Sequence, residues 1–261
     1  MDLNHGRLLD RVFSLPFVWF LSQPHYNTSM KKVDLRKIAI LKIIVEEYIK
    51  TGDIVGSKSL LKKHEMGVSS ATVRSDMANL EKMGLIFQPY NSAGRLPTTR
   101  GIRVFVDYLM EYMLPQMLEA ENDLTQRNDL ERVDDAIYSL VAKLTKTTKE
   151  ITFGCIPSLE ANYYLGLTNY LEKNIPLLGG EAYNVIKVLE NKYHFLDLLH
   201  NLEVGRKVAV FIGEENIIPE LESSAMIVKR ITVEGKDAYI GMLGSLKMDY
   251  AFNIAALQNI L

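Results

Sequence analysis

Residues 69–97 read SSATVRSDMANLEKMGLIFQPYNSAGRLP, and this stretch decides the fold of the first half of the chain. Ser69 or Ser70 is suited to cap a helix, and Gly84 is suited to close it. Apolar residues recur at helical spacing on one face of that helix, namely Val73, Met77 and Leu80. The stretch therefore predicts a helix with one buried face and one polar face.

A β-hairpin is predicted directly after this helix. Leu85–Phe87 reads as a strand, Asn91–Arg95 as a mobile turn, and Leu96–Pro97 as the returning strand. We expect Arg95 at the tip of this wing, where it could enter a minor groove or hold a phosphate. The alternative is that Arg95 is a solvated loop residue.

Two more helices are predicted upstream of residue 69. Apolar residues recur at steps of three and four from Leu35, with Asp34 placed to cap the helix and Thr51-Gly52 to end it. A shorter helix follows from Ser57 to about Lys63, and Gly67 supplies the next turn. The order of helix, turn, helix and wing predicts a winged helix-turn-helix.

The outer face of the helix after residue 69 has the chemistry of a DNA-reading surface. Short hydroxyl and amide side chains can reach phosphates or base edges, and an arginine can grip guanine through two hydrogen bonds. The small residues that begin the helix let its N-terminus approach a phosphate. A solvated amphipathic face is the alternative. The residues predicted to contact DNA are Lys58, Ser69, Ser70, Thr72, Arg74, Ser75, Asn79, Arg95, Arg100 and Arg103.

The charge of the chain is unevenly divided. Residues 31–112 carry 14 Lys and Arg against 9 Asp and Glu, and the later residues carry 14 against 21. Since binding to a polyanion needs local positive charge, this division favours a DNA-binding module joined to a domain that does not touch nucleic acid. The single cysteine, Cys155, permits no internal disulfide and favours a cytoplasmic protein in which it is an inert buried thiol.

Several strings in the sequence resemble the heat-inducible transcription repressors of the HrcA type. The strings occur in the family's order, and a further set matches landmarks of its C-terminal domain. They are Val55–Lys58, Ser69–Met77, Ser92–Thr98, Gly166–Leu171, Phe211–Asn216 and Gly244–Tyr250. The resemblance covers most of the chain after Met30.

The resemblance implies a function and a fold. Members of the family bind an inverted-repeat operator, called CIRCE, upstream of chaperone genes, and depend on a chaperonin that keeps them active. The implied fold is α+β, an N-terminal winged helix-turn-helix followed by a reduced GAF-like α/β domain. The chain departs from the family because Ile151–Pro157 passes almost at once to Tyr163, where relatives carry an inserted dimerising domain. Ser245 and Lys247 replace the usual Pro and Arg.

The second half reads as a small α/β domain. A long helix is predicted from about Gln116 to Glu150, with an apolar stripe that is either a dimer seam or a face buried in its own domain. The apolar runs 208–212, 225–233 and 238–243 predict strands, and the turn at Glu234–Asp237 makes the last two antiparallel. The expected domains are a disordered leader at 1–30, a winged helix at 31–113, and the GAF-like domain at 114–261.

No pattern in the sequence indicates catalysis. His64, His194 and His200 lack metal-ligand spacing, and phosphate-binding and nucleophile motifs are missing. Glu214, Glu215 and Asp249 are read as loop and helix-cap residues rather than a metal set. The apolar run in the leader is too short to span a membrane. We expect a repressor that is not an enzyme, with no cofactor and no metal, acting as a homodimer on an operator duplex, with a chaperonin as a possible partner and no membrane contact.

Two other functions are compatible with the sequence. The second half could bind a small molecule that the winged helix reports, which would require a pocket with convergent polar groups. Alternatively, the winged helix could be an adaptor for another protein, in which case DNA binding would be feeble and would lack a steep salt dependence.

Overall fold

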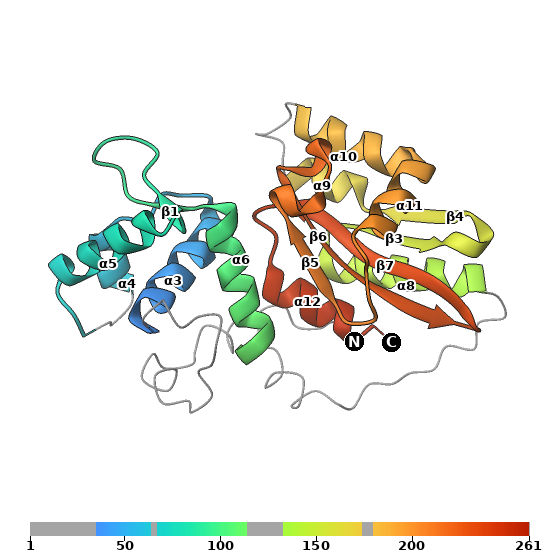
Figure 1. The fold of residues 1–261 in the computed structure, drawn as a ribbon, viewed down its shortest axis with the longest axis horizontal. Helices are drawn as coiled ribbons and strands as arrows, with labels where there is room; N and C mark the ends of the chain where they lie inside the picture. Colours follow the sequence, from blue (N-terminus) through green and yellow to red (C-terminus); the bar gives the residue numbers. More distant parts are fainter. Residues whose placement is uncertain (1–34, 64–66, 114–132, 174–179, 261) are drawn as a thin grey trace. The chain divides into compact units, whose positions relative to one another are not determined.

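The computed structural model describes residues 35–63, 67–113, 133–173 and 180–260, and it combines helices and sheets in an α+β protein (Figure 1). The expectations for the leader at 1–30, for the Asp34 cap and for the beginning of the helix from Gln116 fall outside the described residues. Contacts divide the chain into two compact units. We describe the first through residues 35–113 and the second through residues 133–260.

The first unit has the predicted order of three helices, a hairpin and a further helix. This order follows from the helix-ending glycines, since Gly52, Gly67 and Gly84 all have positive φ and interrupt the helices. Its elements are α3 (Leu35–Thr51), α4 (Ser57–Lys63), α5 (Ser70–Lys82), β1 (Ile86–Phe87), β2 (Leu96–Pro97), α6 (Thr99–Tyr108) and the π-helical turn η1 (Leu109–Met113).

The core of the first unit lies where α3 packs against α5 and α6. The predicted inner face of α5 is confirmed, because Val73, Met77 and Leu80 are buried. They pack in a unit whose other buried side chains include Ile44 of α3 and Val106 of α6. Burial of these apolar faces positions α5 with its opposite face toward solvent.

Two glycines allow close backbone contacts at the base of the β1–β2 hairpin. A Cβ atom on Gly101 would clash with the carbonyl oxygen of Leu85, and one on Gly94 would clash with the carbonyl oxygen of Val55. The backbone of Val55 also exchanges two hydrogen bonds with that of Arg95, of 3.0 and 2.9 Å. The hairpin is therefore fastened to the segment between α3 and α4.

The second unit is built on a five-stranded sheet in which all pairs are antiparallel, with the strand order β4-β3-β7-β6-β5. Helices precede and follow the strands. The elements are α8 (Val133–Thr148), β3 (Ile151–Ile156), β4 (Ala161–Leu165), α9 (Leu167–Lys173), α10 (Gly180–Glu190), α11 (Lys192–Asn201), β5 (Ala209–Ile212), β6 (Ser224–Val233), β7 (Lys236–Ser245) and α12 (Tyr250–Gln258).

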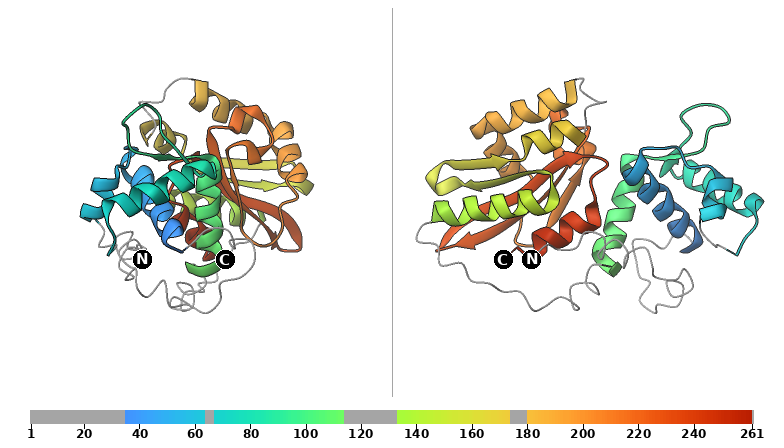
Figure 2. Two further views of the ribbon diagram at one scale, coloured as in Figure 1. Left: turned by 60° about the vertical axis from the view of Figure 1, so that its left-hand side comes forward. Right: turned by 180° about the vertical axis from the view of Figure 1, so that it is seen from behind.

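Helices cover both faces of this sheet (Figures 1 and 2). Side chains alternate along β3, so that Phe153 contributes to the core shared with α9, α10 and α11 while Gly154 faces α8. α12 lies on the α8 side and contacts α8 and β6. Because both faces are buried, all six residues of β3 are inaccessible to solvent.

The predicted hairpin near the end of the chain is confirmed. β6 and β7 pair along their whole length, from Ser224 opposite Ser245 to Val233 opposite Lys236. Glu234 and Gly235 have φ of 48° and 77°, the left-handed conformations that a tight two-residue turn between twisted strands needs.

The alternatives for the apolar stripe of α8 are also resolved. Ile137, Val141 and Leu144 are buried, and a Cβ on Gly154 of β3 would contact the first two. The stripe is therefore a face that α8 buries against its own sheet, although Leu140, predicted to belong to it, is only half-buried.

Candidate nucleic-acid interface

α5 begins at the cap predicted from the sequence. The Ser69 side chain accepts a hydrogen bond of 3.1 Å from the Thr72 backbone N–H, and the hydroxyls of Ser69 and Thr72 lie 2.9 Å apart. This arrangement satisfies one N–H of the first turn and leaves both hydroxyls at the protein surface. Ser70, the second candidate for the cap, is instead the first residue of the helix.

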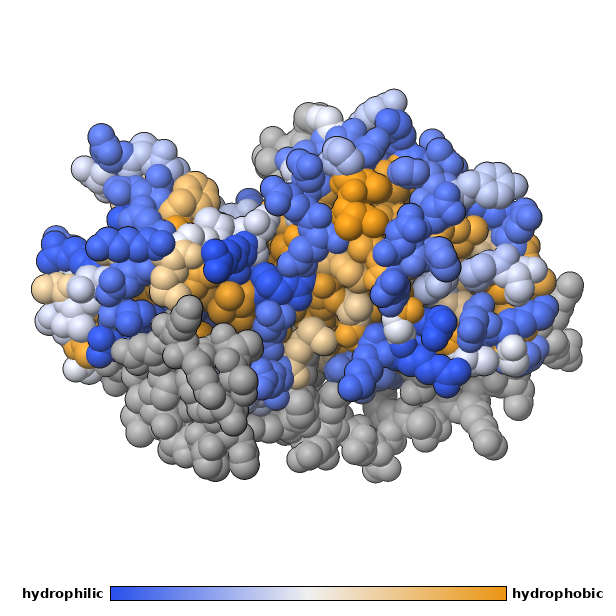
Figure 3. All heavy atoms as spheres, in the orientation of Figure 1, coloured by the Kyte–Doolittle hydropathy of each residue, from blue (hydrophilic) through white to orange (hydrophobic). Residues whose placement is uncertain are grey.

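The outer face of α5 is polar and accessible. Arg74, Ser75 and Asn79 are exposed, whereas Ser70 and Thr72 are half-buried. The Arg74 guanidinium donates a hydrogen bond of 3.2 Å to the backbone oxygen of Ser70, which lays the side chain along the helix toward its N-terminus. Hydrophilic residues are prominent over α5 and the β1–β2 hairpin in the space-filling view (Figure 3).

A buried ion pair below this face was missed by the sequence reasoning. Asp76 is 3% exposed, and its carboxylate accepts hydrogen bonds from Arg36 of α3 at 2.6 and 3.2 Å. An acid at an inner helical position, beside Val73 and Met77, was the available signal, because a buried carboxylate needs a cationic partner. The pair connects α5 to α3 through two hydrogen bonds.

The predicted position of Arg95 at the hairpin tip is wrong. The turn contains Asn91 and Ser92, with Ser92 in the left-handed region at φ 65°. Arg95 instead lies at the base, where its side chain is 18% exposed and donates hydrogen bonds of 2.8 and 3.2 Å to Glu81 of α5. The backbone pairing with Val55 holds the residue there, because it places Arg95 directly before β2.

The remaining predicted cations lie on other helices of the first unit. Lys58 is exposed in the first turn of α4, and Arg100 is exposed in the first turn of α6. Arg103 is half-buried and pairs with Asp107 one turn further along α6, at 3.2 Å. The predicted residues therefore come from α4, α5, the hairpin and α6.

Two of the three acidic residues considered as a metal set have structural roles. Asp249 caps α12 by accepting a hydrogen bond of 3.0 Å from the Phe252 backbone, and Glu215 accepts one of 2.9 Å from the Ile212 backbone. Glu214 is exposed. Within the described ranges, no group of three or more His, Cys, Asp and Glu residues is arranged to hold a metal ion.

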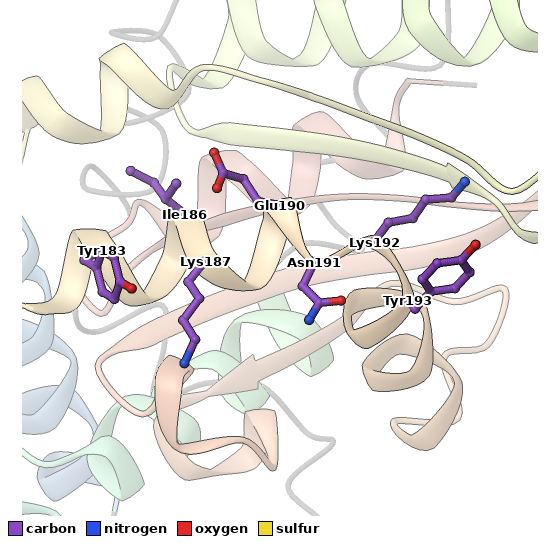
Figure 4. Close-up of a pocket in the computed structure, with 7 residues that line it drawn as sticks. All are labelled: Tyr183, Ile186, Lys187, Glu190, Asn191, Lys192 and Tyr193. Atoms are coloured by element: carbon purple, nitrogen blue, oxygen red, sulfur yellow. The ribbon is translucent and has the colours of Figure 1, made fainter.

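The second unit has a surface depression of about 520 Å³ where α10 meets α11 (Figure 4). Its lining side chains diverge, because Ile186 and Glu190 point to one side of α10 while Tyr183 and Lys187 point to the other. Tyr183 and Tyr193 are each 67% exposed. The depression thus lacks the converging polar groups that fix a small ligand.

Glu150 and Cys155 are two of the buried groups in the second unit whose pKa is shifted. Burial raises the pKa of Glu150 above its ordinary value, and the neighbouring Lys173 ammonium, 2.7 Å away, opposes this rise. Burial also raises the pKa of the Cys155 thiol, which donates to Asn162 at 2.9 Å. A protonated, inaccessible thiol is a poor nucleophile, so Cys155 behaves as a small apolar side chain.

The protein has two units, and the first presents the polar face of a helix beside a hairpin. Residues 98–254 match the family model described as the HrcA protein C terminal domain. This match covers more than half of the chain, and the chain therefore belongs to the HrcA family.

Relatives with curated names agree with this family. The chain is 38% identical over 162 residues to a heat-inducible transcription repressor HrcA from Clostridium perfringens, a region that spans 60% of this chain and 44% of the relative. It is 44% identical over 122 residues to the protein of the same name from Ruminiclostridium cellulolyticum, spanning 44% of this chain and 34% of that one. The matched region is less than half of either relative.

Solved structures support the fold alone. A crystal structure titled as a hypothetical protein superposes with a TM-score of 0.69 at 18% identity, covering 87% of this chain and 96% of that one.

In the ranges that the structure describes, no helix is both long enough and apolar enough to cross a membrane.

Proposed function

We propose that the first unit is a winged helix-turn-helix that binds duplex DNA, with α5 in the major groove. The observation that carries this proposal is the accessible outer face of α5, where Arg74, Ser75 and Asn79 stand opposite the buried apolar face. α4 precedes this helix and the β1–β2 hairpin follows it, which is the order of the DNA-binding motif.

We further propose that the chain is a repressor of heat-shock genes that acts on an inverted-repeat operator. The names of the relatives support repression that heat relieves. The second unit would be a reduced GAF-like domain that holds two chains together, with a chaperonin as a regulating partner in the cytoplasm. Two half-sites require two α5 helices about 34 Å apart, or a multiple of the helical turn, and hence a dimer.

We propose different tasks for the predicted residues. Arg74 would grip a guanine, while the hydroxyls of Ser70, Thr72 and Ser75 would contact phosphates or base edges. Ser69 would hold the N-terminus of α5 in shape. Asn79, Arg100 and Arg103 would extend the contact surface, and Lys58 would bind a backbone phosphate. Arg95, bonded to Glu81, would hold the hairpin against α5 rather than enter a groove.

Heat would act through the second unit. If that unit is marginally stable, warming would separate the two chains, and the paired half-sites would be released together. Operator affinity should then fall at the temperature where the second unit begins to open. An affinity that stays constant up to global unfolding would contradict this mechanism.

A gel-shift experiment tests DNA binding directly. The chain should bind an inverted-repeat CIRCE operator more tightly than a scrambled duplex of the same length, at both of two salt concentrations. Higher salt should weaken binding to both duplexes, because cationic side chains displace counterions from the phosphates. Equal, salt-insensitive binding to the two duplexes would reject the proposal.

Single substitutions separate base contacts from phosphate contacts. Arg74→Ala should weaken the free energy of operator binding by about 1 to 3 kcal/mol if the guanidinium bonds a base. The loss of binding to scrambled DNA should be smaller. Lys58→Ala should weaken binding to the operator and to the scrambled duplex equally. Arg206→Ala removes an exposed arginine of the second unit and should leave both affinities unchanged.

The alternative of a ligand-sensing regulator has less support. The depression between α10 and α11 is open, and its side chains diverge. A thermal-shift screen against common metabolites would revive this alternative if one compound raised the melting temperature of the chain.

A further inference from the structure

The β1–β2 hairpin has an exposed aromatic side chain that the DNA contacts proposed above do not use. Tyr90 is 65% exposed, and its side chain forms no hydrogen bond, ion pair or ring contact with another described residue. Phe87, on β1 of the same hairpin, is 42% exposed. Single exposed aromatic residues are common on protein surfaces, so the meaning of this one depends on the structure around it.

The loop between β1 and β2 holds Tyr90 in a defined backbone conformation. The backbone N–H of Ala93 donates a hydrogen bond of 3.0 Å to the carbonyl oxygen of Tyr90, and Ser92 between them has φ of 65°. The Gln88 side-chain amide donates another, of 3.1 Å, to the carbonyl oxygen of Ala93. Pro89 fixes its own φ directly before the tyrosine. A tyrosine on such a loop loses little conformational entropy when a partner covers its ring.

The base of this loop is fastened to the helix that is proposed to enter the major groove. Arg95 donates hydrogen bonds of 2.8 and 3.2 Å to Glu81 of α5, and its backbone pairs with that of Val55. The loop projects from the first unit beyond this base (Figure 1). Because the two grooves of a duplex lie side by side, a loop next to a helix in the major groove can reach the adjacent minor groove.

The chemistry of the loop fits the uncharged part of a duplex. The sequence from Phe87 to Gly94, FQPYNSAG, contains no charged side chain that would attract or repel phosphates. The sugars that border the minor groove present apolar edges, and exposed Asn91 can donate to the base acceptors in that groove. A protein partner fits less well, because Phe87 and Tyr90 are the only exposed large apolar side chains among the described residues of the first unit. Two such residues are too few for a standard protein interface.

We propose that Tyr90 is the residue through which the hairpin contacts DNA, with its ring packed against the deoxyribose edge of the minor groove beside α5. The inference rests on the proposed DNA binding and adds to it an uncharged contact. This contact is independent of base sequence, because every nucleotide has the same sugar. Tyr90 would thus do at the loop what the sequence suggested for Arg95.

The salt dependence of affinity separates this contact from those of the cations. Tyr90→Ala should weaken binding to the operator and to the scrambled duplex alike, by about fivefold to tenfold. The slope of log affinity against log salt should stay as in the parent chain, because an uncharged side chain displaces no counterion. Lys58→Ala should instead make that slope shallower by about 1. Tyr183→Ala is the matched control, since it removes a tyrosine of the second unit that is 67% exposed and should change neither affinity nor slope.

A fluorescence measurement detects the contact without relying on a loss of affinity. Tyr90→Trp places an indole on the loop, and its emission should become shielded from iodide when duplex DNA is added. The signal of the parent chain, which comes from Trp19, is subtracted. Tyr183→Trp is the control, and the quenching of its emission by iodide should be the same with and without DNA.

The outcomes distinguish this inference from the proposed function. If the parent chain binds no duplex, the proposed function fails and the inference fails with it. If the parent chain binds but Tyr90→Ala binds equally well, or if the slope of Tyr90→Ala falls as that of Lys58→Ala does, the inference alone is overturned. Tyr90→Ala should also melt like the parent chain, because the ring is exposed. A lower melting temperature would mean that the ring stabilises the fold, which would also overturn the inference.

Discussion

The outer face of α5 and the base of the β1–β2 hairpin contain similar residues but differ in where their polar groups find partners. On α5, Arg74 is exposed, and its hydrogen bonds to described residues stay within its own helix. At the base, the Arg95 guanidinium donates a hydrogen bond to Glu81, and the neighbouring Gly94 lies in close backbone contact with Val55. Residues of one family-specific stretch of sequence therefore have two different roles. An arginine in a motif is not by itself a nucleic-acid contact.

The largest expected effect comes from filling the close contact at the hairpin base. Gly101→Ala should lower the free energy of unfolding by about 3 kcal/mol or more, because its Cβ would clash with the Leu85 carbonyl in a packed core. Gly56→Ala is the matched control, since a Cβ there meets nothing. Denaturant unfolding measures both, and equal stabilities would show that the base is loosely packed.

A smaller loss is expected at the ion pair beneath α5. Asp76→Ala should cost about 1 to 3 kcal/mol, because it removes two hydrogen bonds that Arg36 donates to a buried carboxylate. Exposed Asp53→Ala should change stability by less than about 0.5 kcal/mol. The comparison fails if both variants unfold at the same denaturant concentration.

The two arginines themselves sharpen the comparison. Arg95→Ala should lower the free energy of unfolding by about 1 kcal/mol and speed amide exchange in the hairpin, because the bonds to Glu81 are half-buried. Arg74→Ala should leave stability unchanged and affect DNA binding alone. If Arg95→Ala weakened only DNA binding, with stability and exchange unaltered, its assignment as a positioning residue would be wrong.

A third cation–carboxylate pair, in the second unit, predicts a pH effect. The raised pKa of Glu150 means that the folded state holds this proton more tightly than the unfolded chain does. Its contribution to stability is therefore full at acidic pH and is lost as the pH rises through the folded pKa. Glu150→Gln should abolish that loss.

The measurement is the difference in unfolding free energy between the parent chain and Glu150→Gln, taken from acidic to neutral pH. The difference should move in favour of the variant as the pH rises, by about 1 kcal/mol or less, because Lys173 offsets part of the burial cost. A flat difference for Glu150→Gln would mean that its carboxylate is well solvated.

Local patterns were enough to predict most of the first unit. The glycines that end α3 and α5, the Ser69 cap and the buried face of α5 were visible in the sequence, because each depends on residues within a few positions. The β6–β7 hairpin was predictable for the same reason. The HrcA family was also recognisable from short strings.

Contacts between distant residues were not predictable in this way. The Arg36–Asp76 pair joins residues 40 positions apart. The pairing of Val55 with Arg95 also joins residues far apart in sequence, and it is the reason why Arg95 lies at the base of the hairpin instead of its tip. The order of strands in the sheet, and hence the edge position of β4, likewise depends on tertiary packing. The DNA contacts themselves stay a prediction.

The burial of the single cysteine has a practical consequence for biophysical work. Cys155 is fully inaccessible in β3, so maleimide dyes should react with it only when the second unit opens. A fluorophore could therefore be attached through a new thiol at exposed Ser92 without first removing the native one. The rate at which Cys155 is labelled on warming would then report how readily the second unit opens.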